Sequence, residues 1–301
     1  MAGMDVGIGL PAAIPGVDGR VVVDWAREGE AHGFTSLGTI DRLVYPNYEP
    51  LIALAAAAAV TQHVRLVTAV LLAPLRANSA LLAKQAASLD RLAGGRLVLG
   101  LGVGSRADDF EASGIDLHRR GRQFDAQLTN MRGIWAGEPR GFAGGIGPQP
   151  TRSGGPALLI GGSAEAAVRR TVEYAEGWIA GGGGVERFTS VSERVRAAWS
   201  AAGRPGRPRL AALNYFALGP RAREHADAFL RHYYAVAGPR ADQAARAALI
   251  TPDLVGEAID AYQAAGCDEL ILFPCDPDPR QVELLARVAR RASTTSASTV
   301  T

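Results

Sequence analysis

The sequence predicts a single α/β domain, a (β/α)8 TIM barrel with inserts over its C-terminal mouth. Short β-type runs alternate with amphipathic helical stretches along the 301 residues. Several runs, such as Arg65–Val70, are almost continuously apolar, which is typical of parallel strands covered on both faces. Eight strand–helix pairs are found, the number that closes such a barrel. We expect this domain to span residues 1–291 and the Ser/Thr-rich tail, 292–301, to be disordered.

Eight short runs of β-branched and apolar residues are the expected strands. Glycine- or polar-rich turns bound most of them, as expected for strands joined to helices. In chain order they are Asp5–Gly9, Thr35–Thr39, Val64–Leu71, Arg96–Leu101, Ala157–Ile160, Gly177–Ala180, Arg209–Leu218 and Glu269–Phe273.

Capping residues mark several helix ends. Gly33 and Gly94 follow amphipathic stretches as C-terminal glycines, and Thr251 precedes Pro252 as an N-cap. The expected helices are Val21–His32, Leu51–Gln62, Ser79–Leu92, Arg122–Trp135, Ala164–Ala175, Val185–Ala202, Pro252–Ala265 and Arg280–Arg291.

Two interruptions of the alternation are expected over the mouth. One combines Ser105–Arg120 with Ala136–Pro156, and the other is Arg221–Leu249. The second has two interpretations, a mobile lid hinged at Gly238-Pro239 or a helix pair fixed on the rim. Its apolar residues at three- and four-residue steps are expected to face inward: Ala226, Phe229, Leu230 and Tyr233.

Composition excludes several classes of partner. The 32 basic and 30 acidic residues nearly balance, and no basic cluster is interleaved with aromatics, so we expect no nucleic-acid partner. The longest apolar run, Leu51–Val60, is about half of a membrane span. We expect no signal peptide before the first strand, and we expect no disulfide between Cys267 and Cys275, which lie too far apart along a strand. We therefore expect a cytoplasmic protein.

The turn Gly161-Gly162-Ser163 follows a strand and opens a helix. Free backbone N–H groups and the helix dipole favour an anion at such a position, so the turn is a candidate phosphate site. The alternative is a tight turn with Ser163 as an ordinary N-cap.

A second glycine-rich stretch, residues 100–104, does not fit the dinucleotide-binding pattern. Its Gly102 and Gly104 are expected to let a flat ring approach the backbone, or simply to form a strand-to-loop turn. Arg106, just beyond, is expected either to contact a phosphate or to be solvated.

Polar residues follow the second strand at the mouth. Asp41, Arg42 and Tyr45 could bind substrate or orient a proton, with Asp41 and Arg42 as the catalytic candidates; the alternative is a salt bridge beside a packed tyrosine. His118 is the one histidine in a loop near the mouth. No metal-ligand spacing occurs, and the single lysine, Lys84, lies within a helix, which disfavours a catalytic metal and Schiff-base chemistry.

A family resemblance runs along the chain to about Arg291. The segments that carry it, by residue number, are 33–37 with 41–43, 89–96, 100–104, 120–125, 134–138, 160–163 and 175–178. Together they resemble the luciferase-like flavin-dependent monooxygenases, and their combination is specific although no single motif is.

The resemblance implies a cofactor, reduced FMN or the deazaflavin coenzyme F-420, at the mouth. It implies that Gly161, Gly162 and Ser163 hold the phosphate with help from Arg106. It also implies that Thr68, Ala69 and Val70 line the ring, where relatives often have a bulge or a non-proline cis peptide. Two further assignments complete the expected site: Gly181 to the cofactor and, beside Tyr45 and His118, Asn214 to the substrate.

Two departures from the family pattern bear on the cofactor. Asp41-Arg42 replaces the Asp-His of many deazaflavin-dependent relatives, and Gly38 replaces a common Trp, which we expect to open space near the ring. Arginine is a poor acid, because its pKa exceeds about 12.

The expected function is therefore that of an FMN monooxygenase acting with O2 on a small organic substrate. We expect a homo-oligomer that receives reduced FMN from a separate flavin reductase. The alternatives are F-420-dependent hydride transfer and a non-catalytic flavin-binding protein; a barrel lyase lacks the lysine or metal it would need.

Overall fold

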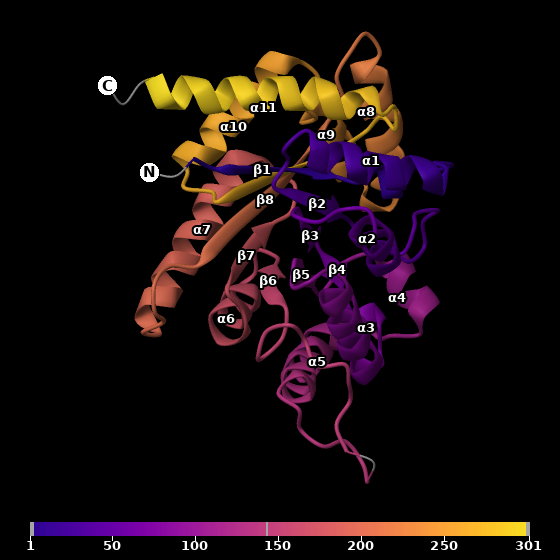
Figure 1. The fold of residues 1–301 in the computed structure, drawn as a ribbon, viewed down its shortest axis with the longest axis vertical. Helices are drawn as coiled ribbons and strands as arrows, with labels where there is room; N and C mark the ends of the chain where they lie inside the picture. The colour runs from indigo at the N-terminus through magenta and orange to yellow at the C-terminus, as the bar shows by residue number, and fades with distance from the viewer. Residues whose placement is uncertain (1–2, 143, 299–301) are drawn as a thin grey trace.

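Nine parallel strands form one closed sheet in the computed structural model, which describes residues 3–142 and 144–298 (Figure 1). The sheet runs β3-β2-β1-β9-β8-β7-β6-β5-β4, and β3 also pairs with β5. Since β3 and β4 share one place in the ring, the sheet is an eight-stranded barrel, as predicted. The strands are β1 Asp5–Gly9, β2 Ser36–Thr39, β3 Arg65–Thr68, β4 Leu71–Leu72, β5 Leu97–Gly102, β6 Ala157–Gly161, β7 Gly177–Ala180, β8 Arg209–Phe216 and β9 Glu269–Pro274.

The third strand of the ring is broken in two at residues 69 and 70. Before the break Leu66 pairs with Leu97, whereas after it Leu71 pairs with Leu101, so this strand carries one extra residue relative to β5. That is a β-bulge. The Ala69–Val70 peptide bond is cis. Both features were expected from the family resemblance at this position.

Helices follow the strands and surround the barrel. They are α1 Gly19–Ala31, α2 Pro50–Ala58, α3 Ser79–Leu92, α4 Ala107–Ser113, α5 Arg120–Trp135, α6 Glu165–Tyr174, α7 Gly184–Ala201, α8 Ala222–Tyr233, α9 Arg240–Arg246, α10 Pro252–Ala264 and α11 Arg280–Ser298, with 3-10 turns η1 Pro11–Ala13, η2 Ala73–Leu75, η3 Leu117–Arg119 and η4 Ala235–Ala237.

The largest boundary difference is at the C-terminal helix. The sequence predicts an end at Arg291 and a disordered tail, but α11 continues to Ser298. Extending an existing helix adds one hydrogen bond per residue without a new nucleus, so Ser and Thr are tolerated there. The last three residues of the expected tail lie outside the described part of the chain.

Side chains alternate between two apolar layers. On β8, Leu210, Ala212 and Phe216 pack between barrel and helices, whereas Leu213 and Tyr215 belong to the cluster that fills the barrel. This two-residue period is that of a strand buried on both faces. The barrel interior is therefore a packed core, and chemistry is confined to its ends.

A buried carboxylate lies at the start of β9, at the N-terminal end of the barrel. Glu269 is fully buried and accepts hydrogen bonds from Arg65 at 2.9 Å and Arg209 at 2.7 Å. Burial would raise the pKa of Glu269, but the two guanidinium groups outweigh it and lower the pKa below its ordinary value. This network stabilises the end of the barrel opposite the mouth.

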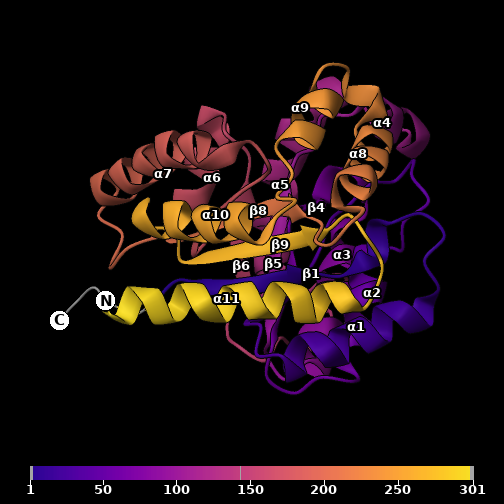
Figure 2. The same ribbon diagram turned by 90° about the horizontal axis from the view of Figure 1, so that it is seen from above.

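The insert after β8 lies over the C-terminal mouth, as predicted. The segment 136–156, which was also expected there, joins α5 to the start of β6 and so lies at the opposite end of the barrel. In Figure 2, β9 points toward the end of the molecule where α4, α8 and α9 gather. Ala226, Phe229, Leu230 and Tyr233 of α8 are buried in the same cluster as the barrel interior. The expected inward face of this helix is confirmed.

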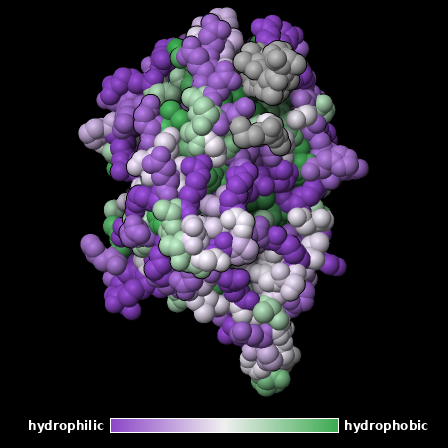
Figure 3. All heavy atoms as spheres, turned by 90° about the vertical axis from the view of Figure 1, so that its left-hand side faces the viewer, coloured by the Kyte–Doolittle hydropathy of each residue, from purple (hydrophilic) through white to green (hydrophobic). Residues whose placement is uncertain are grey.

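Other general expectations concern the surface and the cysteines. Cys267 and Cys275 are free thiols, as predicted. Hydrophilic residues cover most of the face drawn in Figure 3, with hydrophobic ones in small groups. Among the described helices, none has the length and apolar character needed to cross a membrane. Within the same residues, no three His, Cys, Asp or Glu side chains gather in a metal-binding arrangement.

Candidate active site at the barrel mouth

The turn between β6 and α6 has free backbone donors. Gly162 has φ = +115°, a conformation that L side chains rarely adopt, and its carbonyl accepts a 2.7 Å hydrogen bond from Trp178 Nε1. The N-cap of α6 is Ala164, so Ser163 is not the ordinary N-cap that the alternative interpretation required. The N–H groups of Ser163 and Ala164 have no acceptor in the part of the chain that the structure describes. Such a turn is suited to an anion.

Two arginines of α7 border this turn. Arg187 Nη2 donates to the Ser163 hydroxyl at 2.7 Å, and Arg194 Nη1 donates to the Ser163 carbonyl at 3.0 Å. Arg194 also pairs with Glu165, whereas Arg187 has no carboxylate partner among the described residues. The turn therefore carries one uncompensated positive charge at its hydroxyl. Sequence reasoning missed both arginines, although their seven-residue spacing places them on one face of a helix.

Val70 occupies the space above the glycines of β5 and β6. A Cβ on Gly102 would lie 2.7 Å from Val70 Cγ2, and one on Gly161 would lie 2.8 Å from Val70 Cγ1. On Gly100 it would lie 2.0 Å from the carbonyl oxygen of Thr68, whose hydroxyl donates to the Gly100 carbonyl at 2.7 Å. Gly100, Gly102 and Gly161 thus make room for the bulge, and an approach of a flat ring to Gly102 and Gly104 stays a prediction.

The space beside Gly38 is also filled. A Cβ on Gly38 would lie 2.8 Å from Phe273 Cζ, and one on Gly9 would lie 2.2 Å from Phe273 Cδ1. The expectation that Gly38 opens space near a ring is therefore wrong. Phe273 of β9, two strands away in the sheet, fills this space, because alternate strands of a barrel point side chains into the same interior layer.

Asp41 and Arg42 both have partners within the protein. The Asp41 carboxylate accepts from the Leu72 N–H at 2.8 Å and from Arg76 at 2.7 Å. Arg42 donates to Asp109 at 2.9 Å and pairs with Asp108. These are the contacts of the ion-pair alternative, and a chemical role for either residue stays a prediction.

Aromatic side chains of α8 and η4 meet those of the barrel at the mouth. Tyr215 of β8 lies 6.3 Å from both Phe229 and Phe273, centroid to centroid, and its hydroxyl is 2.8 Å from that of Tyr234. Burial raises the pKa of Tyr215 well above its ordinary value, so the phenol stays protonated.

Tyr45 packs as the alternative interpretation predicts. Its ring lies edge-on to Tyr233 at 5.0 Å, and its hydroxyl is 3.0 Å from His232 Nδ1. Burial raises the pKa of Tyr45 to about 12, against a smaller opposite effect of Arg42. His232, which the sequence did not single out, thus joins α8 to the loop after β2.

Arg106 lies among these rings. Its guanidinium carbon is 4.9 Å from the Tyr233 ring and 5.1 Å from the Tyr234 ring. No hydrogen bond or ion pair of this group occurs among the described residues, and no contact joins it to the turn at 161–163. The structure therefore places it with the insert, where its charge is available to a bound anion.

The remaining expected residues differ in their placement. Gly181, after β7, is exposed, and a Cβ there would meet nothing within 4 Å. Gly104 has φ = +74°. His118 is exposed on η3 and contacts no other expected site residue. On β8, Tyr215 faces the barrel interior and Asn214 alternates with it, so a contact of Asn214 with substrate stays a prediction.

Comparison with known proteins agrees with this geometry. Residues 4–272 match the family model for luciferase-like monooxygenase. An uncharacterised Mycobacterium tuberculosis protein is 32% identical over 199 residues, which are 57% of this chain and 68% of the relative. An FMNH(2)-dependent dimethylsulfone monooxygenase of Pseudomonas putida is 26% identical over 61% of this chain and 52% of its own.

Solved structures show the same fold. A monooxygenase from Streptomyces bottropensis superposes with a TM-score of 0.77 at 24% identity, over 94% of this chain and 98% of its own. An F420-dependent secondary alcohol dehydrogenase gives 0.77 at 16% identity, over 95% and 98% of the two chains. Both an oxygenase and a deazaflavin enzyme thus share the architecture.

Proposed function

This chain belongs to the luciferase-like monooxygenase family, and on that premise we propose that it is a flavin-dependent monooxygenase using reduced FMN and O2 on a small organic substrate. The observation that carries the proposal is the turn at residues 161–163. Its unpaired amides, the hydroxyl of Ser163 and the uncompensated charge of Arg187 fit a phosphate monoester, which FMN carries.

The chain's own residues then bind, orient and exclude water. The turn and Arg187 hold the phosphate, and Val70, nested against Gly102 and Gly161, supports one side of the ring. The aromatic residues of α8 cover the mouth and keep water out. Reduced FMN, when bound, supplies the electrons that activate O2. A separate flavin reductase would renew the reduced cofactor.

Coenzyme F-420 is the second candidate cofactor, because one feature of the mouth suits hydride transfer. That reaction needs a proton donor, and the protonated Tyr215–Tyr234 hydroxyl pair is a neutral donor inside the mouth. It is ranked below FMN because neither Asp41 nor Arg42 is a free acid at the position that deazaflavin relatives use.

Direct binding measurements test the choice. The apoprotein is titrated with FMN and with F-420, each oxidised and reduced, and the Kd values are compared. Tighter binding of reduced FMN, followed by O2 consumption in the presence of substrate, supports the proposal. Tighter binding of F-420 refutes it, and flavin binding without any turnover would mean a non-catalytic flavin-binding protein.

Variants of the turn test the phosphate site. Gly162→Asp places a carboxylate against the phosphate and should weaken FMN binding by a large factor, and Arg187→Gln should weaken it about tenfold. Arg287→Gln is the matched control, since that arginine pairs with Glu283 on the outer face of α11. FMN affinity that is unchanged in folded Arg187→Gln and Gly162→Asp proteins would show that the turn is only structural.

A further inference from the structure

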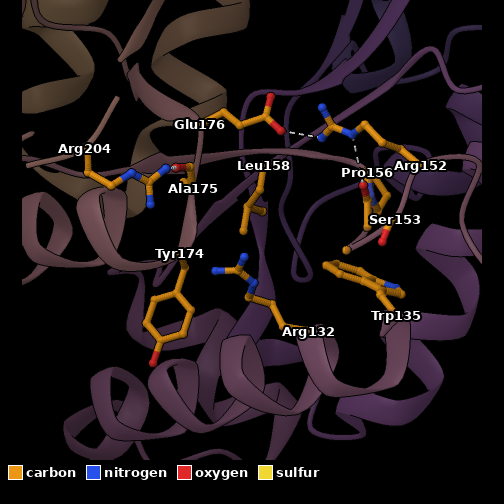
Figure 4. Close-up of a pocket in the computed structure, with 12 residues that line it drawn as sticks. Arg132, Trp135, Arg152, Ser153, Pro156, Leu158, Tyr174, Ala175, Glu176 and Arg204 are labelled. Atoms are coloured by element: carbon orange, nitrogen blue, oxygen red, sulfur yellow. Dashed lines mark hydrogen bonds and ion pairs between the residues drawn. The ribbon is translucent and has the colours of Figure 1, made fainter. Parts of the chain in front are cut away.

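A positively charged cavity lies at the opposite end of the barrel from the mouth. Its volume is about 320 Å³, and it is bordered by the end of α5, the loop before β6, the end of α6 and the loop after α7. Figure 4 shows the side chains that converge on it. Since β6 and β7 begin beside this cavity, it is separate from the candidate cofactor site, which lies where β6 ends.

Three arginines and one carboxylate line the cavity. Arg152 pairs with Glu176, and both side chains are about half exposed. Arg132 makes a single long hydrogen bond of 3.3 Å to the Glu173 carbonyl, and Arg204 donates only to the carbonyls of Val172 and Ala175. Neither Arg132 nor Arg204 has a carboxylate partner among the described residues. Two positive charges therefore face one cavity without a counter-ion.

The geometry of Arg132 favours a ligand over a purely structural role. Arg204 caps the last carbonyls of α6 at 2.8 Å and lies over Trp199, which explains its position. Arg132 is exposed, and its one 3.3 Å contact uses a single donor of a group that has five, so its other donors are open to solvent and to a ligand. In Figure 4 its guanidinium projects between Tyr174, Leu158 and Trp135 toward the middle of the cavity.

The rest of the lining combines apolar and aromatic side chains with Ser153 and the backbone of Gly154 and Gly155. Trp135 and Leu158 are buried and Tyr174 is half-buried, and all three face the cavity beside Pro156. A volume of about 320 Å³ exceeds that of a free phosphate ion and accommodates an attached ring or short chain. The cavity thus offers cations for a charged group and an apolar wall for what the group is attached to.

We infer that this cavity binds a small organic phosphomonoester, with its phosphate between Arg132, Arg152 and Arg204 and its organic part against Trp135 and Tyr174. The charge selects the class. A phosphomonoester is close to a dianion above pH 7, so it neutralises the two unpaired guanidinium charges, whereas a carboxylate neutralises one. Arginine's fork of N–H donors also matches phosphate oxygens in pairs.

The test uses phenyl phosphate as the probe and the full-length protein. Affinity is measured by calorimetry at pH 7.5 and constant ionic strength in a phosphate-free buffer, beside benzoate as a monoanion of similar size. We expect saturable binding of phenyl phosphate, at least tenfold tighter than that of benzoate. Among the indole N–H signals of the four tryptophans, that of Trp135, assigned with a Trp135→Phe variant, should shift on titration.

Three variants locate the site. Arg132→Gln should weaken phenyl phosphate binding about tenfold or more, because it removes one unpaired charge. Arg207→Gln is the control, since Arg207 lies on the same loop as Arg204 but is 72% exposed and outside the cavity. Arg207→Gln should bind phenyl phosphate within twofold of the unaltered protein. Arg187→Gln reports any binding at the mouth, whose turn also suits a phosphate monoester, so in that variant the cavity is followed through the Trp135 indole signal, whose titration should change by less than twofold.

The possible outcomes are decisive. Binding that is lost in Arg187→Gln and kept in Arg132→Gln places the probe at the mouth and overturns the inference. Equal affinity for benzoate, or no saturable binding, overturns it as well. If Arg132→Gln fails to fold, Arg152→Gln replaces it, because losing that partly exposed charge should weaken the same binding. Failure here leaves the proposed function untouched, since FMN binding is measured at the other end of the barrel.

Discussion

Replacing Arg42 by alanine should mainly destabilise the protein. The Arg42 side chain is 2% exposed and its partner Asp109 is fully buried. Without the guanidinium, the Asp109 carboxylate stays in a low-dielectric site without its direct ion-pair partner. Breaking a buried pair from one side costs about 3–5 kcal/mol.

The structure narrows that range. Asp109 Oδ1 also accepts the N–H groups of Leu43 and Val44, at 3.0 and 2.7 Å, and these bonds survive the substitution. We therefore expect a loss near the lower limit, about 3 kcal/mol. For a chain of this size, 1 kcal/mol shifts the melting temperature by roughly 2–4 °C, so Arg42→Ala should melt about 6–12 °C lower.

The melting temperature and the free energy of unfolding in denaturant are measured, and the turnover of the folded fraction is measured beside them. Arg27→Ala is the control, because Arg27 pairs with Asp24 at the surface and should change the stability by less than about 1 kcal/mol. A double-mutant cycle of Arg42→Ala with Asp109→Asn measures their coupling. An unchanged melting temperature together with a large loss of turnover would refute this reasoning and restore Arg42 to the chemistry.

Three further predictions concern other parts of the molecule. Glu269→Gln should lower the free energy of unfolding by about 3 kcal/mol. Because the folded pKa of Glu269 is lowered, its contribution to stability is present above the unfolded pKa and is lost as pH falls through the folded value. Urea titrations from pH 6 to pH 3 should therefore show a declining stability of the unaltered protein and a smaller decline in the variant. Burial raises the pKa of Cys267 to about 12 and that of Cys275 further, so at pH 8 neither thiol should react with a chromogenic disulfide reagent until urea unfolds the chain; fast reaction of the native protein would contradict this. The insert Arg221–Leu249 should exchange amide hydrogens faster than the barrel strands and slow on FMN binding, whereas equal protection with and without FMN would leave only a fixed rim helix.

The fold was predictable because its signal is local. Continuous apolar runs and capping residues repeat along the chain, and they locate the eight strands and most of the helices within a few residues, although α4 was not expected and α11 extends further than predicted. The interior face of β8 was harder to predict than the strand itself. Which alternate residues face the interior depends on how the strands close into a barrel, and one step along the strand exchanges Asn214 for Tyr215.

Contacts between residues far apart in the sequence could not be predicted from local patterns. Nothing near Gly38 in the sequence indicates that Phe273 fills its space, because the two residues come together only when the barrel closes. The same holds for Asp109, whose pairing with Arg42 spans 67 positions. The turn at 161–163 was found because its chemistry is contained in three consecutive residues, while its arginines come from the next helix.

The aromatic side chains of α8 fill the mouth of the barrel. Phe229 packs against Tyr215 of β8, and Tyr233 packs against Tyr45 of the loop after β2. If the proposed flavin ring binds where these side chains lie, it must displace them. Binding is then an exchange, and the measured Kd is the intrinsic Kd divided by the fraction of molecules with the insert displaced. Truncating Phe229 would therefore tighten the apparent affinity even though it removes contact area.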